Sequence, residues 1–154
     1  LSRYQTTMEL VKQIDYTKPK IISCSYFFKK PELESLKKIF KKLKIGIAVN
    51  PEKFNKKYFF AVEKIVDIFY YDLNVYGKKN IKTFSLKDCL DQINYLKRLN
   101  KPIYVGGGIN HNNAKFVIDN AEPSGLDISR SLKDSNNYIC ENKLNKLIKT
   151  LSTY

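Results

Sequence analysis

The sequence predicts an α/β fold with a parallel sheet, and three observations lead to this class. Short apolar, β-favouring runs alternate with segments whose apolar residues recur at helical spacing. Helix-start and turn signals separate these segments at regular intervals. No low-complexity linker interrupts the alternation, so residues 1–154 are expected to form one domain. Strict alternation implies parallel strands with right-handed crossovers, in a doubly wound sheet or a barrel.

The N-terminal half contains three strand–helix steps. Thr6 has capping-box spacing to a Glu three residues on and opens a helix that ends before Pro19. Pro31 suits the first turn of a second helix. Asn50-Pro51 starts a third helix, which we expect to run as far as Ile65. The strands of this half are expected at 21–28, 45–49 and 68–72.

The C-terminal half begins with a polar segment, 73–82, which we interpret as a loop. Ser85 then caps a helix that extends through Leu96. The remaining elements are a strand at 103–105, a helix at 112–120, a strand at 126–129 and a helix at 139–151. The chain thus contains five predicted strands, too few to close an eight-stranded barrel.

Charge alone suggests nucleic-acid binding, because the net charge is +13. However, 25 of the 28 basic residues are Lys and only three are Arg, the residue preferred for bidentate phosphate and base contacts. The Lys residues are also spread over the predicted helices rather than gathered in one tract. Composition therefore argues against a nucleic-acid partner.

Other features of the composition restrict the function classes further. Three widely spaced cysteines without a CxxC pair indicate free thiols, and a single His, His111, argues against a metal centre. We interpret His111 as a residue of the surface or of a helix's first turn, and Cys24 as a core thiol. No apolar run is long enough to span a membrane, and we expect a cytoplasmic protein.

In parallel α/β folds, ligands bind beyond the carboxyl ends of the strands. Two strand ends here carry Gly106-Gly107-Gly108 and Ser129-Arg130-Ser131. Glycines let main-chain amides approach an anion, and the second turn adds hydroxyls and a guanidinium. We predict a phosphate site formed by these two turns. Asp72 ends an apolar strand and is the candidate general acid or base.

These residues resemble the C-terminal part of the phosphoribosylanthranilate isomerase family. Pro123, Gly125, Asp127 and Ser129 match the family's Pro-x-Gly-Val-Asp-Val-Ser at identical spacing. Gly107-Gly108-Ile109 followed by Asn113 resembles its Gly-Gly-Leu-x-Pro-x-Asn. Weaker similarity joins Asp72, Gly77 and Lys82-Thr83-Phe84 to its general-acid strand and the loop that follows.

The resemblance implies a (β/α)8 TIM-barrel-type fold represented by its last five βα units, without the first three. It implies an isomerase of tryptophan biosynthesis, of the aldose–ketose type, which catalyses the Amadori rearrangement of N-(5-phosphoribosyl)anthranilate. Asp72 would be the general acid. The residues that would bind the substrate phosphate are Gly107, Gly108, Ser129, Arg130 and Ser131. The small phosphorylated sugar would be the ligand, and neither a cofactor nor a metal is implied.

Several positions depart from the family pattern. The family's general base is a Cys on its first strand, and no corresponding segment is present. Asp-Thr-Lys is replaced by Asp72-Leu73-Asn74, and the turn after Ser129 lacks the family's Gly and Glu. Three interpretations follow: an isomerase completed by a further piece or by another copy that covers the open barrel edge, a ribulose-phosphate 3-epimerase-like barrel, or a non-catalytic sugar-phosphate-binding protein.

Overall fold

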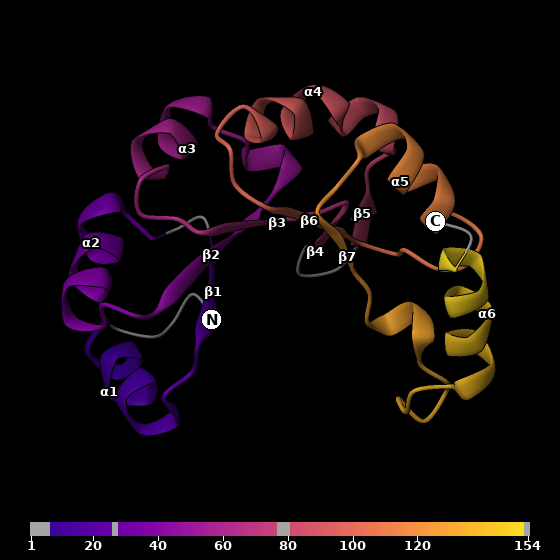
Figure 1. Ribbon diagram of the computed structural model, residues 1–154, viewed down its shortest axis with the longest axis horizontal. Helices are drawn as coiled ribbons and strands as arrows, with labels where there is room; N and C mark the ends of the chain where they lie inside the picture. The colour runs from indigo at the N-terminus through magenta and orange to yellow at the C-terminus, as the bar shows by residue number, and fades with distance from the viewer. Residues whose placement is uncertain (1–6, 26–27, 77–80, 153–154) are drawn as a thin grey trace.

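The computed structural model describes residues 7–25, 28–76 and 81–152. Its main feature is a five-stranded sheet in the order β1-β2-β3-β6-β7, in which every neighbouring pair is parallel. The strands follow one another around an arch (Figure 1). They are β1 (Ile21–Ser25), β2 (Lys44–Val49), β3 (Ile68–Asp72), β6 (Ile103–Gly106) and β7 (Gly125–Asp127).

The α-helices line the outer, convex side of this arch (Figure 1). The order of the strands in space follows their order in the sequence, without the reversal that characterises a doubly wound sheet. The winding is therefore that of a barrel, and the five strands leave it open, as the sequence predicts. The helices are α1 (Thr7–Thr17), α2 (Lys30–Ile39), α3 (Lys56–Val62), α4 (Leu86–Lys97), α5 (Ala114–Ala121) and α6 (Glu141–Leu151).

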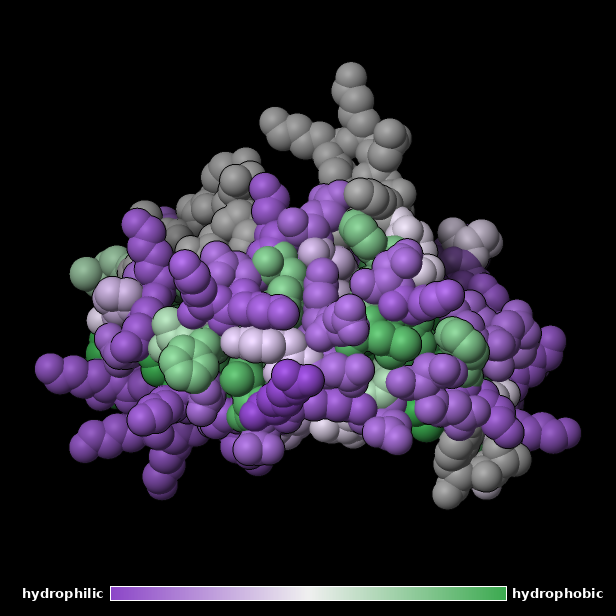
Figure 2. Space-filling model, turned by 90° about the horizontal axis from the view of Figure 1, so that it is seen from above, coloured by the Kyte–Doolittle hydropathy of each residue, from purple (hydrophilic) through white to green (hydrophobic). Residues whose placement is uncertain are grey.

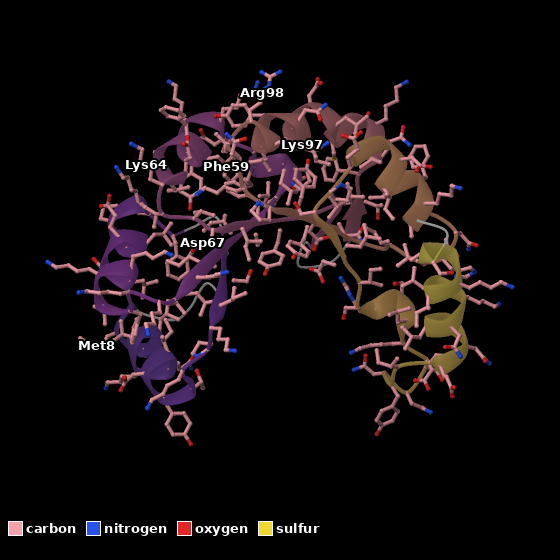
Figure 3. All side chains as sticks on the ribbon, in the orientation of Figure 1. Met8, Phe59, Lys64, Asp67, Lys97 and Arg98 are labelled. Carbon is pink, nitrogen blue, oxygen red and sulfur yellow. The ribbon has the colours of Figure 1, made fainter. Side chains whose placement is uncertain are left out.

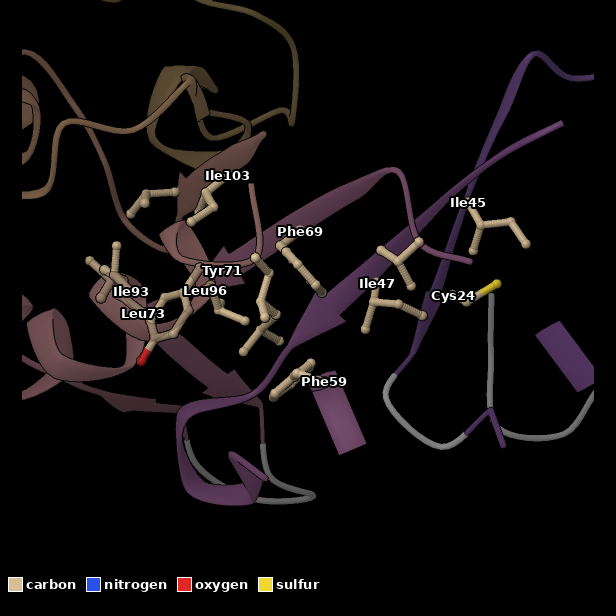
Figure 4. Packing of buried hydrophobic residues seen from close by; sticks show 14 of the residues in the cluster. Cys24, Ile45, Ile47, Phe59, Phe69, Tyr71, Leu73, Ile93, Leu96 and Ile103 are labelled. Atoms are coloured by element: carbon tan, nitrogen blue, oxygen red, sulfur yellow. The ribbon is translucent and has the colours of Figure 1, made fainter. Parts of the chain in front are cut away.

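The hydrophobic core lies between the sheet and the helices (Figure 4). Strand side chains alternate between two faces, and in β2 Ile45, Ile47 and Val49 are almost completely buried on the outward face. Phe59 of α3 packs edge-on against Phe69 of β3, with ring centroids 5.7 Å apart. Cys24 is fully buried in the same core, as predicted. This packing fixes the strand ends at which the candidate site lies.

The inward, concave face of the sheet has a different composition. Tyr70 and Tyr104 are neighbours on it, with ring centroids 5.7 Å apart. The Tyr70 ring covers Gly46, where a Cβ would lie 2.4 Å from it, and the Tyr104 ring covers Gly125 at 2.6 Å. Closed barrels fill this space with bulky branched side chains. Here two aromatic rings lie over glycines instead.

The convex surface is mostly hydrophilic. Figure 2 looks onto it and shows hydrophilic side chains over most of the face, with apolar ones between them. The exposed aromatic residues include Phe60 of α3 and Phe116 of α5. Within the described ranges, no helix is both long enough and apolar enough to cross a membrane.

The interpretation of 73–82 as a loop is wrong. Asn74–Tyr76 (β4) and Ile81–Thr83 (β5) pair as an antiparallel hairpin, with Asn74 opposite Thr83. Val75, Tyr76, Ile81 and Thr83 favour extended structure, but the polar residues between the strands obscured this signal. The hairpin holds Asn74 beside the end of β3. Gly77 and residues 78–80 lie outside the described residues.

The helix expected over 51–65 is interrupted. Pro51–Lys53 form a single 3-10 turn, η1, and α3 begins only at Lys56. The cause is Asn55, whose side chain accepts the Tyr58 N–H at 3.1 Å and so caps a new helix. Asn50 caps η1 as expected, since its side chain accepts the Glu52 N–H at 2.9 Å. The other boundaries differ from prediction by a few residues, and Thr6 is outside the described residues.

Lys37 of α2 contacts the residues that directly precede strands β2 and β3. Its Nζ lies 2.6 Å from Asp67 Oδ2 and donates to Leu43 O at 2.9 Å, and Asp67 Oδ2 also accepts the Ile45 N–H at 2.8 Å. The Lys37 and Asp67 side chains are 28% and 33% exposed. Loss of the cation would leave a half-buried carboxylate without its counter-charge.

We therefore expect Lys37→Met to lower the free energy of unfolding by about 1–2 kcal/mol. Lys97→Met is the matched control, because Lys97 pairs at 3.2 Å with Glu122, whose side chain is 80% exposed. That variant should lose less than about 0.5 kcal/mol. Urea unfolding of both variants measures the difference. Equal losses would show that the Asp67 network adds nothing beyond an ordinary surface pair.

Candidate functional site

The carboxyl ends of three neighbouring strands meet at one point of the sheet. Asp72 of β3 is level with Gly106 of β6, and Gly106 is level with Asp127 of β7. Residues that are level in a parallel sheet point their side chains to the same face. Asp72 and Asp127 therefore stand on either side of Gly106, and the Asp127 side chain packs against it, since a Cβ there would lie 3.1 Å from Asp127 Cβ and 3.4 Å from its Oδ2.

A pocket of about 230 Å³ opens beside these strand ends. All six residues predicted to form the site line it, from the end of β3, the glycine turn after β6 and the turn after β7. Asn74, Ile109 and Asp127 line it as well, although the sequence did not predict them as site residues. The lining residues are Asp72, Asn74, Gly107, Gly108, Ile109, Asp127, Ser129, Arg130 and Ser131.

The glycine turn packs main chain against main chain. Gly107 has φ +95° and Gly108 has φ +82°, a region that favours glycine. A Cβ at Gly107 would lie 2.5 Å from Asp72 Oδ1 and 2.6 Å from the nitrogens of Leu73 and Asn74. The Leu73 N–H donates to Gly106 O at 2.9 Å and joins the two strand ends. The close approach that glycine permits therefore forms one wall of the pocket.

Side-chain amides hold the other side of this turn. Asn110 and Asn113 both donate from Nδ2 to Gly108 O, at 3.1 Å and 3.2 Å. Asn113 Oδ1 accepts the Asn110 N–H at 2.8 Å. These bonds fix the turn before α5 begins. The arrangement is thus set before any ligand binds, which is the condition for an effective anion site.

The turn after β7 is tied to the glycine turn. Residues Arg130–Leu132 form a 3-10 turn, η2, closed by a Leu132 N–H to Ser129 O bond of 3.1 Å. The Ser131 hydroxyl donates to Ile109 O and so joins the two turns directly. Ser129, Arg130 and Ser131 consequently face the glycines across the pocket.

Asp72 is the titratable group with the clearest perturbation in this pocket. Partial burial raises the pKa of its carboxyl above the ordinary value of 3.8. The Asn74 N–H, which donates to Asp72 Oδ1 at 2.9 Å, and the Arg130 charge oppose that rise in pKa, whereas Asp127 adds to it. A carboxyl that keeps its proton to higher pH than usual is suited to act as a general acid.

Two other candidate groups lie elsewhere. Burial raises the pKa of the Cys24 thiol to about 11, so it stays protonated at neutral pH within the core. His111 is half-buried in the turn before α5 and does not line the pocket. No group of three His, Cys, Asp or Glu side chains in the described part of the chain is arranged to hold a metal ion.

The missed residues carried weak signals. Asp127 belongs to the quoted motif and ends a predicted strand, so its place at the strand end could have been inferred. Asn74 lay in a segment interpreted as a loop and could not be placed without the hairpin. Ile109 contributes apolar surface directly after the glycines.

No protein-family model matches the chain, and no curated protein matches it. Solved structures do. The chain is similar to N-(5'-phosphoribosyl)anthranilate isomerase from Pyrococcus furiosus, with 18% identity, a TM-score of 0.69, and coverage of 97% of this chain and 70% of that one. The chain is also similar to a phosphoribosyl anthranilate isomerase in complex with reduced 1-(O-carboxyphenylamino)-1-deoxyribulose 5-phosphate. The identity is 15%, the TM-score is 0.64, and the match covers 98% of this chain and 69% of that one.

A third similar structure is KGPDC from Streptococcus mutans, with 11% identity, a TM-score of 0.68, and coverage of 97% of this chain and 68% of that one. The TM-scores establish the shared fold, and sequence identities this low carry no conclusion about function. The chain has the fold of about 70% of a barrel of the type found in these isomerases.

Proposed function

We propose that the chain is a phosphoribosylanthranilate isomerase-like protein, whose pocket binds the phosphate of a phosphosugar and whose Asp72 supplies the general acid. The observation that carries this proposal is the pocket itself, which brings a carboxyl of raised pKa together with the two phosphate turns. The fold that the chain shares with these isomerases supports the proposal, and one of them was solved in complex with a reduced deoxyribulose 5-phosphate derivative.

The phosphate would lie between the two turns. In this proposal the main-chain amides of Gly107 and Gly108 would bind phosphate oxygens and the Arg130 guanidinium would add a charge-assisted contact, since all three residues line the pocket. The sugar would then extend toward Asp72 and Asp127. An Amadori rearrangement needs one group that protonates the ring oxygen and another that removes the C2 proton. Asp72 is placed for the first of these roles.

We infer that the base comes from the part of the barrel that the five strands do not form. In the isomerase family that the sequence resembles, the base is a Cys on the first strand. Cys24 cannot replace it, because its thiol is buried on the helix side of the sheet. A complementary piece with three βα units, or a second copy of the chain, would close the arch at β1 and β7.

Phosphate binding is tested by comparing two arginine variants. We expect Arg130→Met to weaken the binding of ribose 5-phosphate and of inorganic phosphate by about ten- to a hundredfold, because a charged hydrogen bond is lost. Arg98→Met is the matched control, since Arg98 lies exposed at the end of α4 on the outer surface (Figure 3). Calorimetric titration measures both ligands. An equal effect of the two variants would refute the phosphate site.

Catalysis is tested by complementation. The chain is mixed with a fragment of the Pyrococcus furiosus isomerase that contains its first three βα units, and turnover of N-(5-phosphoribosyl)anthranilate is followed. Turnover should require both pieces. Binding of ribose 5-phosphate without turnover in any mixture would instead support the second candidate, a non-catalytic sugar-phosphate-binding protein, which the burial of the Cys24 thiol away from the pocket favours.

A further inference from the structure

Asn74 lines the pocket immediately beside Asp72. It is the first residue of the β4–β5 hairpin, and its main-chain N–H donates to Asp72 Oδ1 at 2.9 Å. Its side chain points toward the glycine turn, because Nδ2 lies 3.4 Å from the place where a Gly108 Cβ would be. The side-chain amide therefore lies between the general-acid position and the phosphate turns.

The Asn74 side chain has an acceptor whose bonding capacity is unused. Its Oδ1 is buried and forms no hydrogen bond within the described part of the chain. A buried carbonyl oxygen without a donor lowers stability, and most buried polar groups in folded proteins have a partner. Oδ1 is covered in this structure, but Asn74 lines an open pocket, so a half-turn of its side-chain amide would bring Oδ1 to a bound molecule that supplies the missing donor.

The chemistry of the acceptor decides which part of a ligand it meets. A phosphate monoester that is fully ionised has acceptor oxygens only, because its second pKa is about 6. It cannot donate to a carbonyl oxygen at neutral pH. A sugar hydroxyl can donate, and it can also accept from a neighbouring group.

The geometry points to Asn74 as a specificity-determining residue that reads a hydroxyl group of the phosphosugar through Oδ1. This inference rests on the proposed function, since the phosphate turns must hold the phosphate for the sugar to reach Asn74. It goes beyond that function because it separates recognition of the sugar from recognition of the phosphate. A pocket with this acceptor should prefer a polyhydroxylated phosphate ester to a phosphate ester that has no hydroxyl group.

The test compares two ligands and two isosteric variants. Ribose 5-phosphate and methyl phosphate are titrated into the wild-type chain, into Asn74→Leu and into Asn94→Leu, where Asn94 is an exposed residue of α4. In Asn74→Leu the affinity for ribose 5-phosphate should fall about three- to tenfold, while the affinity for methyl phosphate stays within about twofold. The control variant should change neither.

Thermal unfolding without ligand gives a second readout. Asn74→Leu removes a buried acceptor that has no donor, so its unfolding temperature should rise by about 2–4 °C. A residue kept for structure alone would show the opposite change. Higher stability together with weaker sugar binding is therefore the expected signature of a ligand-reading residue.

Three results would overturn the inference, and they differ from one another. If the wild-type chain binds neither ligand, the phosphate site itself fails, and the proposed function fails with it. If phosphate binds but Asn74→Leu keeps the wild-type preference for ribose 5-phosphate, only the role of Asn74 fails. If both affinities fall equally, Asn74 contacts the phosphate and not the sugar.

Discussion

Replacing Gly107 with alanine should destabilise the chain by about 2–5 kcal/mol and abolish phosphate binding. Two costs add here. An L-residue at φ +95° is strained by about 1–2 kcal/mol, and overpacking against fixed atoms costs about 1–3 kcal/mol more. The new Cβ would meet Asp72 Oδ1 at 2.5 Å and two main-chain nitrogens at 2.6 Å. Main-chain atoms cannot rotate away, so the two strand ends would have to separate.

The neighbouring glycine is the matched control. Gly108 has a similar φ of +82°, but a Cβ there would lie 3.4 Å from Asn74 Nδ2, which is ordinary contact. Gly108→Ala should therefore lose only the strain, about 1–2 kcal/mol. Urea unfolding measures both variants, and titration with inorganic phosphate follows the site. If Gly108→Ala proved as damaging as Gly107→Ala, main-chain packing against Asp72 would not be what the site depends on.

The fold could be predicted from sequence because its signals are local and repeated. Pro31 and Ser85 mark helix starts, and the apolar runs that became β2 and β3 are short and β-favouring. One helix boundary was wrong, because the apolar periodicity predicts a single helix from Pro51, whereas Asn55 caps a new helix. The choice between a barrel and a doubly wound sheet depended on strand order in space, which no local pattern encodes.

The candidate site was predictable to the extent that it depends on strand ends. Gly107 and Arg130 are 23 residues apart in sequence, yet they meet because consecutive parallel strands end at the same edge. Asn74 was not predictable, because its position depends on a hairpin whose pairing is not local. The Tyr70 ring lies over Gly46 because Tyr70 is level with Ala48, and this register between β2 and β3 is not specified by the alternation of residues within each strand. Phosphate binding by these residues stays a prediction.

Asp72→Asn should separate catalysis from binding and from stability. In the complemented protein, turnover of N-(5-phosphoribosyl)anthranilate should fall by about 10²–10⁴-fold, the usual contribution of a positioned general acid. The amide is isosteric and keeps an oxygen that can accept the Asn74 N–H, so the pocket should retain its shape. Binding of inorganic phosphate should stay within about twofold of wild type or become tighter, since one negative charge near the anion is removed.

The pH dependence of the free energy of unfolding shows, independently of activity, whether the ionised Asp72 carboxyl stabilises or destabilises the folded chain. Burial raises the folded-state pKa of Asp72 above 3.8, so the folded chain binds this proton more tightly than the unfolded chain. The resulting stabilisation is fully present below the unfolded pKa and is lost as pH rises through the folded pKa. At pH 7 the wild-type chain thus contains a partly buried carboxylate that Asp72→Asn lacks, and the variant should be the more stable of the two.

Urea unfolding between pH 3 and pH 7 measures this difference, with Asp91→Asn on the exposed face of α4 as the control. The advantage of Asp72→Asn over wild type should grow with rising pH, while Asp91→Asn should follow wild type throughout. A variant that is inactive, more stable at neutral pH and still able to bind phosphate fits a carboxyl placed for proton transfer. A variant that is inactive because it is less stable at neutral pH would instead identify Asp72 as a residue that holds the strand ends together.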